Sequence, residues 1–275
     1  MANWTESVDT DFDFCEESLE PLPVASRGNR AILFNSLIYA CGGNTGYGNS
    51  VTMRTACYTS PTDAIKWSTG PSFNEGRSFY SLVQVGDSLV AAGGRTTNKK
   101  LDSVEILTSS AQSWQLASWT LETVVKSHCA EAISDTEMVI IGGVEKNGNI
   151  SDKVTKYNIN TGAATSLAPY PSKIHKHACA RDGDYIYVTG GEIAFQVVRD
   201  VRRYSISNNA WESLPSMFGT RVEHDVVIFQ GDLVVFGGLG AYSGTRSVQV
   251  YRNGSWSYLS GPDFNFADGS AVVLP

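Results

Sequence analysis

The stretch LVVFGG at 233–238 decides the fold, because four other segments of the chain repeat its pattern. Each is a short apolar run that ends in two glycines: LIYACGG at 37–43, LVAAGG at 89–94, MVIIGG at 138–143 and YIYVTGG at 185–191. The first glycines of successive pairs lie 51, 49, 48 and 47 residues apart. Such a regular period predicts a protein built by repeating one supersecondary unit.

Each unit contains four segments with strand character, named a to d in chain order. Strand b is the run that ends in Gly-Gly, and a polar turn separates it from an apolar strand a, as between SLVQV at 81–85 and LVAAGG. Paired runs of this kind predict hairpins. Strand c ends in Tyr58, Leu107, Tyr157, Tyr204 or Tyr251, and strand d follows near Trp67, Trp114, Ala164, Trp211 or Trp256. Without helical periodicity, four-stranded units of about this length indicate an all-β propeller.

These motifs resemble the kelch repeat family. The shared features are the apolar run with Gly-Gly, the later Tyr and Trp, and an Arg-x-x-His start to strand a, as in Arg221-Val222-Glu223-His224. The resemblance covers about residues 24–262 and implies a β-propeller, whereas fold alone does not imply a function. We expect one propeller over residues 1–275, with blades at about 24–72, 73–121, 122–170, 171–216 and 217–262.

The two ends of the chain supply material for one more blade. The C-terminal run GSAVVLP at 269–275 looks like strand a, and residues 1–23 contain segments like strands c and d. We therefore expect six blades of four antiparallel strands, the sixth formed by residues 263–275 and 1–23 and closed by both termini. Five blades is the alternative.

The net charge of −7 is unevenly distributed. Residues 1–26 hold seven acids and no base, which leaves 21 acids and 21 bases in residues 27–275. A neutral body has no basic face to neutralise phosphates, which argues against nucleic-acid binding. No apolar run reaches the roughly 20 residues of a membrane span, and the N-terminus lacks the features of a secretory signal. We expect a monomeric cytoplasmic protein that binds neither nucleic acid nor membranes.

The cysteines are five in number and have no C-x-x-C spacing. An odd, scattered set in a cytoplasmic protein predicts reduced thiols. This prediction covers Cys41 and Cys57, which lie closest together, and also Cys15, Cys129 and Cys179.

Two patterns raise the question of a metal. His128, His177 and His224 begin strand a in successive units, and we expect them to form hydrogen bonds between blades, with zinc or iron binding as the alternative. Asp9, Asp11 and Asp13 have the spacing of a calcium loop, but Phe14 stands where the turn requires glycine. Alternating Asp and Phe is also typical of an edge strand with solvent-facing acids. We therefore predict no metal and no cofactor.

No motif for a catalytic nucleophile is present, since the chain lacks both Gly-x-Ser-x-Gly and His-Glu-x-x-His. We name no catalytic residue and expect a protein–protein interaction module. A small-molecule or carbohydrate-processing enzyme, or a lectin, that uses the mouth of the channel is the alternative.

Basic residues recur at the joint between strand d of one unit and strand a of the next. Arg77, Lys126 and Arg221 each precede the first glycine of a pair by 16 residues, and Arg27 and Lys173 lie within one residue of that register. The b–c loops share this face and add Arg95, Lys146, Tyr47 and Tyr242. Because guanidinium groups pair bidentately with carboxylates, such a rim predicts binding of an acidic peptide or loop.

The kelch resemblance bears on two of these residues. In kelch receptors that bind acidic peptides, arginines at the d–a joint hold the ligand, and this implies the same role for Arg77 and Arg221. The alternative is that the basic residues only cap loops. A further possibility is that the acidic segment at 6–20 neutralises the rim itself.

Overall fold

The computed structural model of the chain describes residues 20–46, 50–63, 66–240, 247–259 and 270–274. These residues form 25 strands and no α-helix, which confirms the predicted all-β class. The described chain accordingly offers no helix with the length and apolar character of a membrane span.

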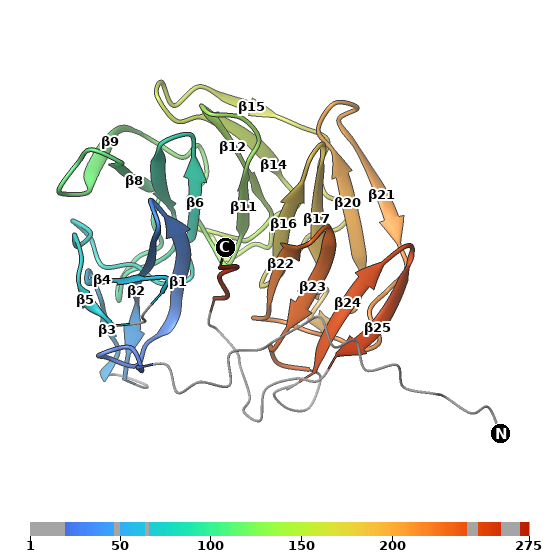
Figure 1. Cartoon of the computed structure of the whole chain (residues 1–275). Coiled ribbons are helices and arrows are strands. Elements are labelled where there is room, and N and C mark those ends of the chain that lie inside the picture. The colour runs from blue at the N-terminus through green and yellow to red at the C-terminus, as the bar shows by residue number, and fades with distance from the viewer. Residues whose placement is uncertain (1–19, 47–49, 64–65, 241–246, 260–269, 275) are drawn as a thin grey trace.

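Five antiparallel sheets, each with four main strands in chain order, radiate from a common centre (Figure 1). Blade 1 comprises β1 (Arg27–Phe34), β2 (Leu37–Thr45), β4 (Cys57–Pro61) and β5 (Ser68–Thr69), with β3 (Thr52–Met53) added beside β2. Blade 2 comprises β6 (Ser81–Val85), β7 (Ser88–Ala92), β8 (Ser103–Thr108) and β9 (Gln115–Thr120). Blade 3 comprises β11 (Cys129–Ala132), β12 (Glu137–Ile141), β14 (Val154–Asn158) and β15 (Ala164–Ser166).

The last two blades follow the same order. Blade 4 comprises β16 (Ala178–Asp182), β17 (Tyr185–Thr189), β20 (Val201–Ser205) and β21 (Ala210–Leu214). Blade 5 comprises β22 (Asp225–Phe229), β23 (Asp232–Phe236), β24 (Val248–Arg252) and β25 (Ser255–Leu259). Two small sheets lie in the connections: β10 (Val125–Lys126) with β13 (Val144–Glu145), and β18 (Glu192–Ile193) with β19 (Gln196–Val197). The innermost strands β1, β6, β11, β16 and β22 are neighbours in this order (Figure 1).

The glycine pairs join each blade to the next. The N–H of Gly43 donates to the carbonyl of Arg77 at 2.8 Å, and Gly94, Gly143 and Gly191 make the same bond to the following blade. Both glycines of the first pair have positive φ, 64° and 83°. A Cβ on Gly42 would stand 2.7 Å from the Arg77 carbonyl oxygen, closer than atoms can approach. The repeated glycines therefore follow from blade-to-blade contact as well as from backbone conformation.

Five blades are present in the described residues, the number given above as the alternative. The expected sixth blade, from residues 263–275 and 1–23, falls mostly outside the described ranges. Its described C-terminal part, residues 270–274, forms no strand. The acidic Asp9–Asp13 pattern, with its edge-strand and calcium interpretations, also lies outside the described residues.

The described ends of the chain contact blades 1 and 5. The backbone N–H of Ala271 donates to the carboxylate of Asp225 on β22 at 2.6 Å. The indole of Trp67 donates to the Glu20 carbonyl at 2.9 Å. In the later units, the corresponding indoles of Trp114, Trp211 and Trp256 donate to carbonyls of Pro71, Ala168 and Pro215 at the end of the preceding blade. The Glu20 carbonyl thus accepts the indole hydrogen bond of blade 1, as the carbonyls of Pro71, Ala168 and Pro215 do for blades 2, 4 and 5.

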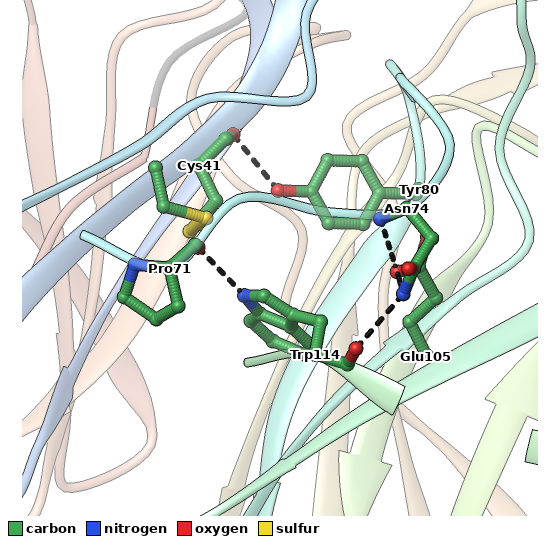
Figure 2. Close-up of a disulfide and its surroundings, with 7 residues drawn as sticks. Cys41, Pro71, Asn74, Tyr80, Glu105 and Trp114 are labelled. Atoms are coloured by element: carbon green, nitrogen blue, oxygen red, sulfur yellow. Dashed lines mark hydrogen bonds between the residues drawn. A yellow bond between two sulfur atoms is a disulfide. The ribbon is translucent and has the colours of Figure 1, made fainter. Parts of the chain in front are cut away.

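Two disulfides overturn the prediction of reduced thiols for four of the five cysteines, and Cys15 lies outside the described residues. Cys41 and Cys57 face each other on β2 and β4, and their Cα atoms lie 4.0 Å apart. This disulfide is buried beside the aromatic rings at the boundary with blade 2 (Figure 2). Cys129 and Cys179 link β11 to β16, so this second bond joins blades 3 and 4. The argument from free thiols fails, and the cytoplasmic location stays a prediction.

Candidate functional site

A series of four backbone hydrogen bonds links the five blades where the inner strands begin. Its members are Gly28, Phe79, Ser127, Lys176 and Glu223, called here the mouth ring, and each has a φ between 55° and 65°. Each later member donates its N–H to the carbonyl of the member in the preceding blade at 2.9 to 3.1 Å. A left-handed conformation costs a non-glycine residue about 1 kcal/mol or more. The hydrogen bonds thus hold the backbone of four non-glycine residues at the mouth in a left-handed conformation that these residues otherwise avoid.

The mouth ring surrounds a hollow at the entrance of the channel. The hollow is lined by Arg30, Phe79, Ser127, His128, Lys176, His177, Glu223 and His224. Polar side chains therefore surround a single aromatic ring, that of Phe79.

Three cations approach the ring of Phe79. The Arg95 guanidinium lies 5.4 Å from the ring centroid, and the Arg27 guanidinium and the Lys126 ammonium each lie 5.8 Å from it. Cations within about 6 Å of an aromatic face are attracted by its quadrupole. Gly28 permits this packing, because a Cβ there would lie 3.2 Å from the Phe79 ring. Phe79, Arg27, Arg95 and Lys126 are called here the Phe79 cluster.

Positive charge in the Phe79 cluster exceeds the negative charge near it. Arg27 pairs with Glu223 at 3.4 Å. Within the described residues, Arg95 and Lys126 make no ion pair, and the Nε of Arg95 is buried without a hydrogen-bond partner. Burial lowers the pKa of Lys126 and the nearby cations Arg95, Lys100 and Lys176 lower it further, while the Glu223 carboxylate offsets a small part of this. Two cations beside Phe79 are thus not held in an ion pair within the described residues.

Three imidazoles lie beneath the mouth. The Nε2 of His128 is 3.0 Å from the hydroxyl of Ser81 in blade 2, and the Nε2 of His224 is 2.8 Å from the hydroxyl of Thr189 in blade 4. These contacts confirm hydrogen bonding between blades for both residues. The prediction is wrong for His177, whose two ring nitrogens are buried without a side-chain partner in the described residues. Burial lowers the pKa of His128, His177 and His224 to about 3, so all three are neutral at pH 7. In the part of the chain that the structure describes, no three His, Cys, Asp or Glu side chains gather around one point.

The structure corrects the expectation for two arginines. Arg77 and Arg221 are 0% and 1% exposed, and their guanidinium groups bond to backbone and side-chain atoms within blades 2 and 5. The prediction that these two arginines bind a partner is wrong, because neither side chain reaches solvent. At this joint the arginine stabilises the blade.

The other predicted site residues divide into three groups. Arg27, Arg95 and Lys126 come together around Phe79. Lys173 is exposed and makes no contact with that ring. Tyr47 and Tyr242 lie outside the described residues. Sequence reasoning missed Phe79 itself, although an aromatic residue two positions after the basic joint residue Arg77 was a signal that could have been used.

Comparison with known proteins agrees with this architecture. The family model described as the KLHDC2/KLHL20/DRC7 Kelch-repeats domain matches residues 28–238. Kelch-like protein 36 of Mus musculus is 27% identical over 207 residues, which cover 72% of this chain and 33% of that protein. Kelch-like protein terF of Aspergillus terreus is 27% identical over 249 residues, which cover 84% of this chain and 53% of that protein. The chain thus spans between a third and about half of these relatives.

The fold also has a solved counterpart. The structure titled "Structure of YjhT" superposes with a TM-score of 0.80 at 16% sequence identity, covering 92% of this chain and 89% of that one. At this identity the likeness concerns the fold alone. Because the family model spans most of the chain and the glycine pairs join the blades as described, the chain belongs to the kelch-repeat β-propeller family.

Proposed function

We propose that this propeller is a protein-interaction module that binds an acidic segment of a partner protein at the Phe79 cluster. The observation that carries the proposal is the presence of Arg95 and Lys126 beside Phe79 without an ion pair to either side chain in the described residues. Membership of the kelch family supports a binding role by fold analogy only. The acidic character of the partner rests on charge complementarity at the mouth.

The chemistry of the cluster suits a carboxylate. The Arg95 side chain is only partly buried and its terminal nitrogens make no ion pair within the described residues, so a bound Asp or Glu would supply acceptors for them. A hydrogen bond between charged groups contributes about 1.5–3 kcal/mol before the cost of ordering the ligand. The partly buried Phe79 ring excludes water on one side of the cations, which strengthens their attraction for an anion. Binding should therefore weaken as salt increases.

A selection from a random peptide display library tests the proposal. The full chain should enrich peptides rich in Asp and Glu, and the Arg95→Ala/Lys126→Ala variant should lose that enrichment. The matched control is Lys146→Ala/Lys173→Ala, which removes the same charge from exposed positions on the same face. It should retain the enrichment. An acidic preference that survives loss of Arg95 and Lys126, with both variants folded, contradicts the proposal.

A further inference from the structure

A second aromatic residue with positive φ lies on the same face of the propeller. The β18–β19 hairpin pairs Glu192 with Val197 and Ile193 with Gln196, which leaves Ala194 and Phe195 as a two-residue loop. Their φ angles are 49° and 64°. Positive φ at both central residues is the signature of a type I′ turn. Asn-Gly is the preferred pair for such a turn, and Ala-Phe is a poor choice.

The Phe195 side chain is not buried by packing within the propeller, so packing does not compensate for the strained backbone. The side chain is 89% exposed, the highest fraction among the exposed large hydrophobic residues of the described chain. A bulky side chain at positive φ is a conformational outlier, and such outliers gather at functional sites. The hairpin thus displays an aromatic side chain at a position where an ordinary turn residue would be more stable.

The base of the hairpin is fixed to the mouth. The backbone of Glu192 pairs with that of His175, and its carboxylate lies 3.4 Å from the ammonium of Lys176, a member of the mouth ring. Ile193 is partly buried against the core shared by blades 3 and 4. Phe195 is three residues beyond Glu192, so at a strand rise of about 3.3 Å per residue it stands within about 10 Å of that contact.

We propose that Phe195 is the apolar anchor of the partner-binding surface. It packs against an apolar side chain that neighbours the acidic residues bound at the Phe79 cluster. The inference rests on the proposed function, and it makes the partner a segment with both acidic and apolar residues. Two observations support it: the cations around Phe79, one of which (Lys126) feels the charge of Lys176 at the hairpin base, and a tight turn that fixes the position of the ring before binding. Pre-positioned aromatic side chains are typical of interface hot spots.

The same peptide display selection tests the anchor separately from the cations. The full chain should enrich peptides in which an aromatic or aliphatic residue stands at a fixed distance from the acids. Phe195→Ser should keep the acidic preference and lose the apolar one, whereas Arg95→Ala/Lys126→Ala should do the reverse. Leu116→Ser is the matched control, because Leu116 is also exposed (61%) but lies on the outer strand β9. This control should change neither preference.

A double-mutant cycle with one selected peptide makes the test quantitative. Phe195→Ser should weaken its binding at least tenfold, and serine at the apolar position of the peptide should weaken it no further in that variant. An apolar preference that is absent, or unchanged by Phe195→Ser, overturns the anchor and leaves the acidic site standing. An apolar preference that depends on Phe195 without any acidic enrichment supports the anchor and overturns the proposed function.

Discussion

Arg77 donates to the carboxylate of Glu105 at 2.7 Å, and neither side chain is exposed to solvent. In blade 5 Arg221 stands in the same register and donates to the carbonyls of Gly237 and Ser247, just as Arg77 donates to those of Gly93 and Ser103. Gln249, however, occupies the position of Glu105. Burial lowers the pKa of Arg221 to about 10, and the amide of Gln249 brings no negative charge to offset this.

We expect Arg77→Met to destabilise the protein far more than Arg221→Met. The first change leaves the Glu105 carboxylate buried without its cation, which typically costs about 3–5 kcal/mol. The second removes a buried charge and leaves only neutral acceptors, whose loss of a hydrogen bond costs about 1–3 kcal/mol each at most. Urea unfolding at pH 7 measures both. Adding Glu105→Gln to Arg77→Met should restore part of the stability, and equal losses in the two single variants would contradict the assignment.

The buried imidazoles predict how stability depends on pH. An unfolded histidine titrates near 6.5, whereas His128, His177 and His224 have a pKa of about 3 in the folded protein. Below pH 6.5 these imidazoles bind protons in the unfolded chain but stay neutral in the folded chain. Stability should therefore fall as pH decreases from 6.5 toward 3, by about 1 kcal/mol per pH unit for each imidazole. His128→Gln should make the fall less steep in urea titrations between pH 7 and 5.

Glu131 acts in the opposite direction and provides the control. Burial, and secondarily the charge of Asp225, raise the pKa of Glu131 to about 8. The folded chain keeps this proton between about pH 4.5 and 8, so its stabilising contribution is present at low pH and is lost as pH rises through 8. Glu131→Gln should therefore make the decline from pH 7 to 5 steeper. A decline that neither variant alters would show that other groups control it.

The two disulfides should differ in their effect on stability. Cys129–Cys179 closes a separation of 50 residues and Cys41–Cys57 one of 16. In the chain-entropy account the longer loop gains about 1 kcal/mol more from its cross-link. Replacing the Cys129–Cys179 pair with alanine should thus lower the free energy of unfolding more than replacing the Cys41–Cys57 pair. Non-reducing peptide mapping should first find both pairs in the native protein, and thiols at all four positions would contradict the disulfides themselves.

The fold was predictable because its signals are local and repeated. Each glycine pair marks the end of strand b, and the contact of Gly42 with the backbone of the next blade explains why the mark recurs. The disulfides were not predictable from spacing. Cys129 and Cys179 meet only because the innermost strands of two blades pack side by side, and Cys41 faces Cys57 only through the register of β2 with β4.

The site was predictable only in part. Spacing identified the joint that carries Arg77 and Lys126, but it could not tell that one side chain turns into the blade and the other toward the mouth. Strand carbonyls hold the inward orientation, since Arg77 and Arg221 both donate to them, and Glu105 adds a buried ion pair for Arg77 alone. The exposure and the positive φ of Phe195 could not be predicted from the sequence either. The segment EIAFQV at 192–197 contains none of the residues that usually mark a tight turn.

The turn at Ala194 and Phe195 yields the last prediction. Replacing the pair with Asn-Gly should raise the free energy of unfolding by about 1 kcal/mol, because these residues adopt positive φ at both central positions with little strain. Phe195→Ser alone keeps a β-carbon at positive φ and should stay within about 0.5 kcal/mol of the natural chain. Thermal and urea unfolding of the three proteins measure the difference. A less stable Asn-Gly variant would mean that the aromatic ring contributes to folding, in which case its exposure would not reflect a role in binding. A more stable variant would show that the chain retains a strained turn at the expense of stability, as expected if Phe195 is kept for a partner.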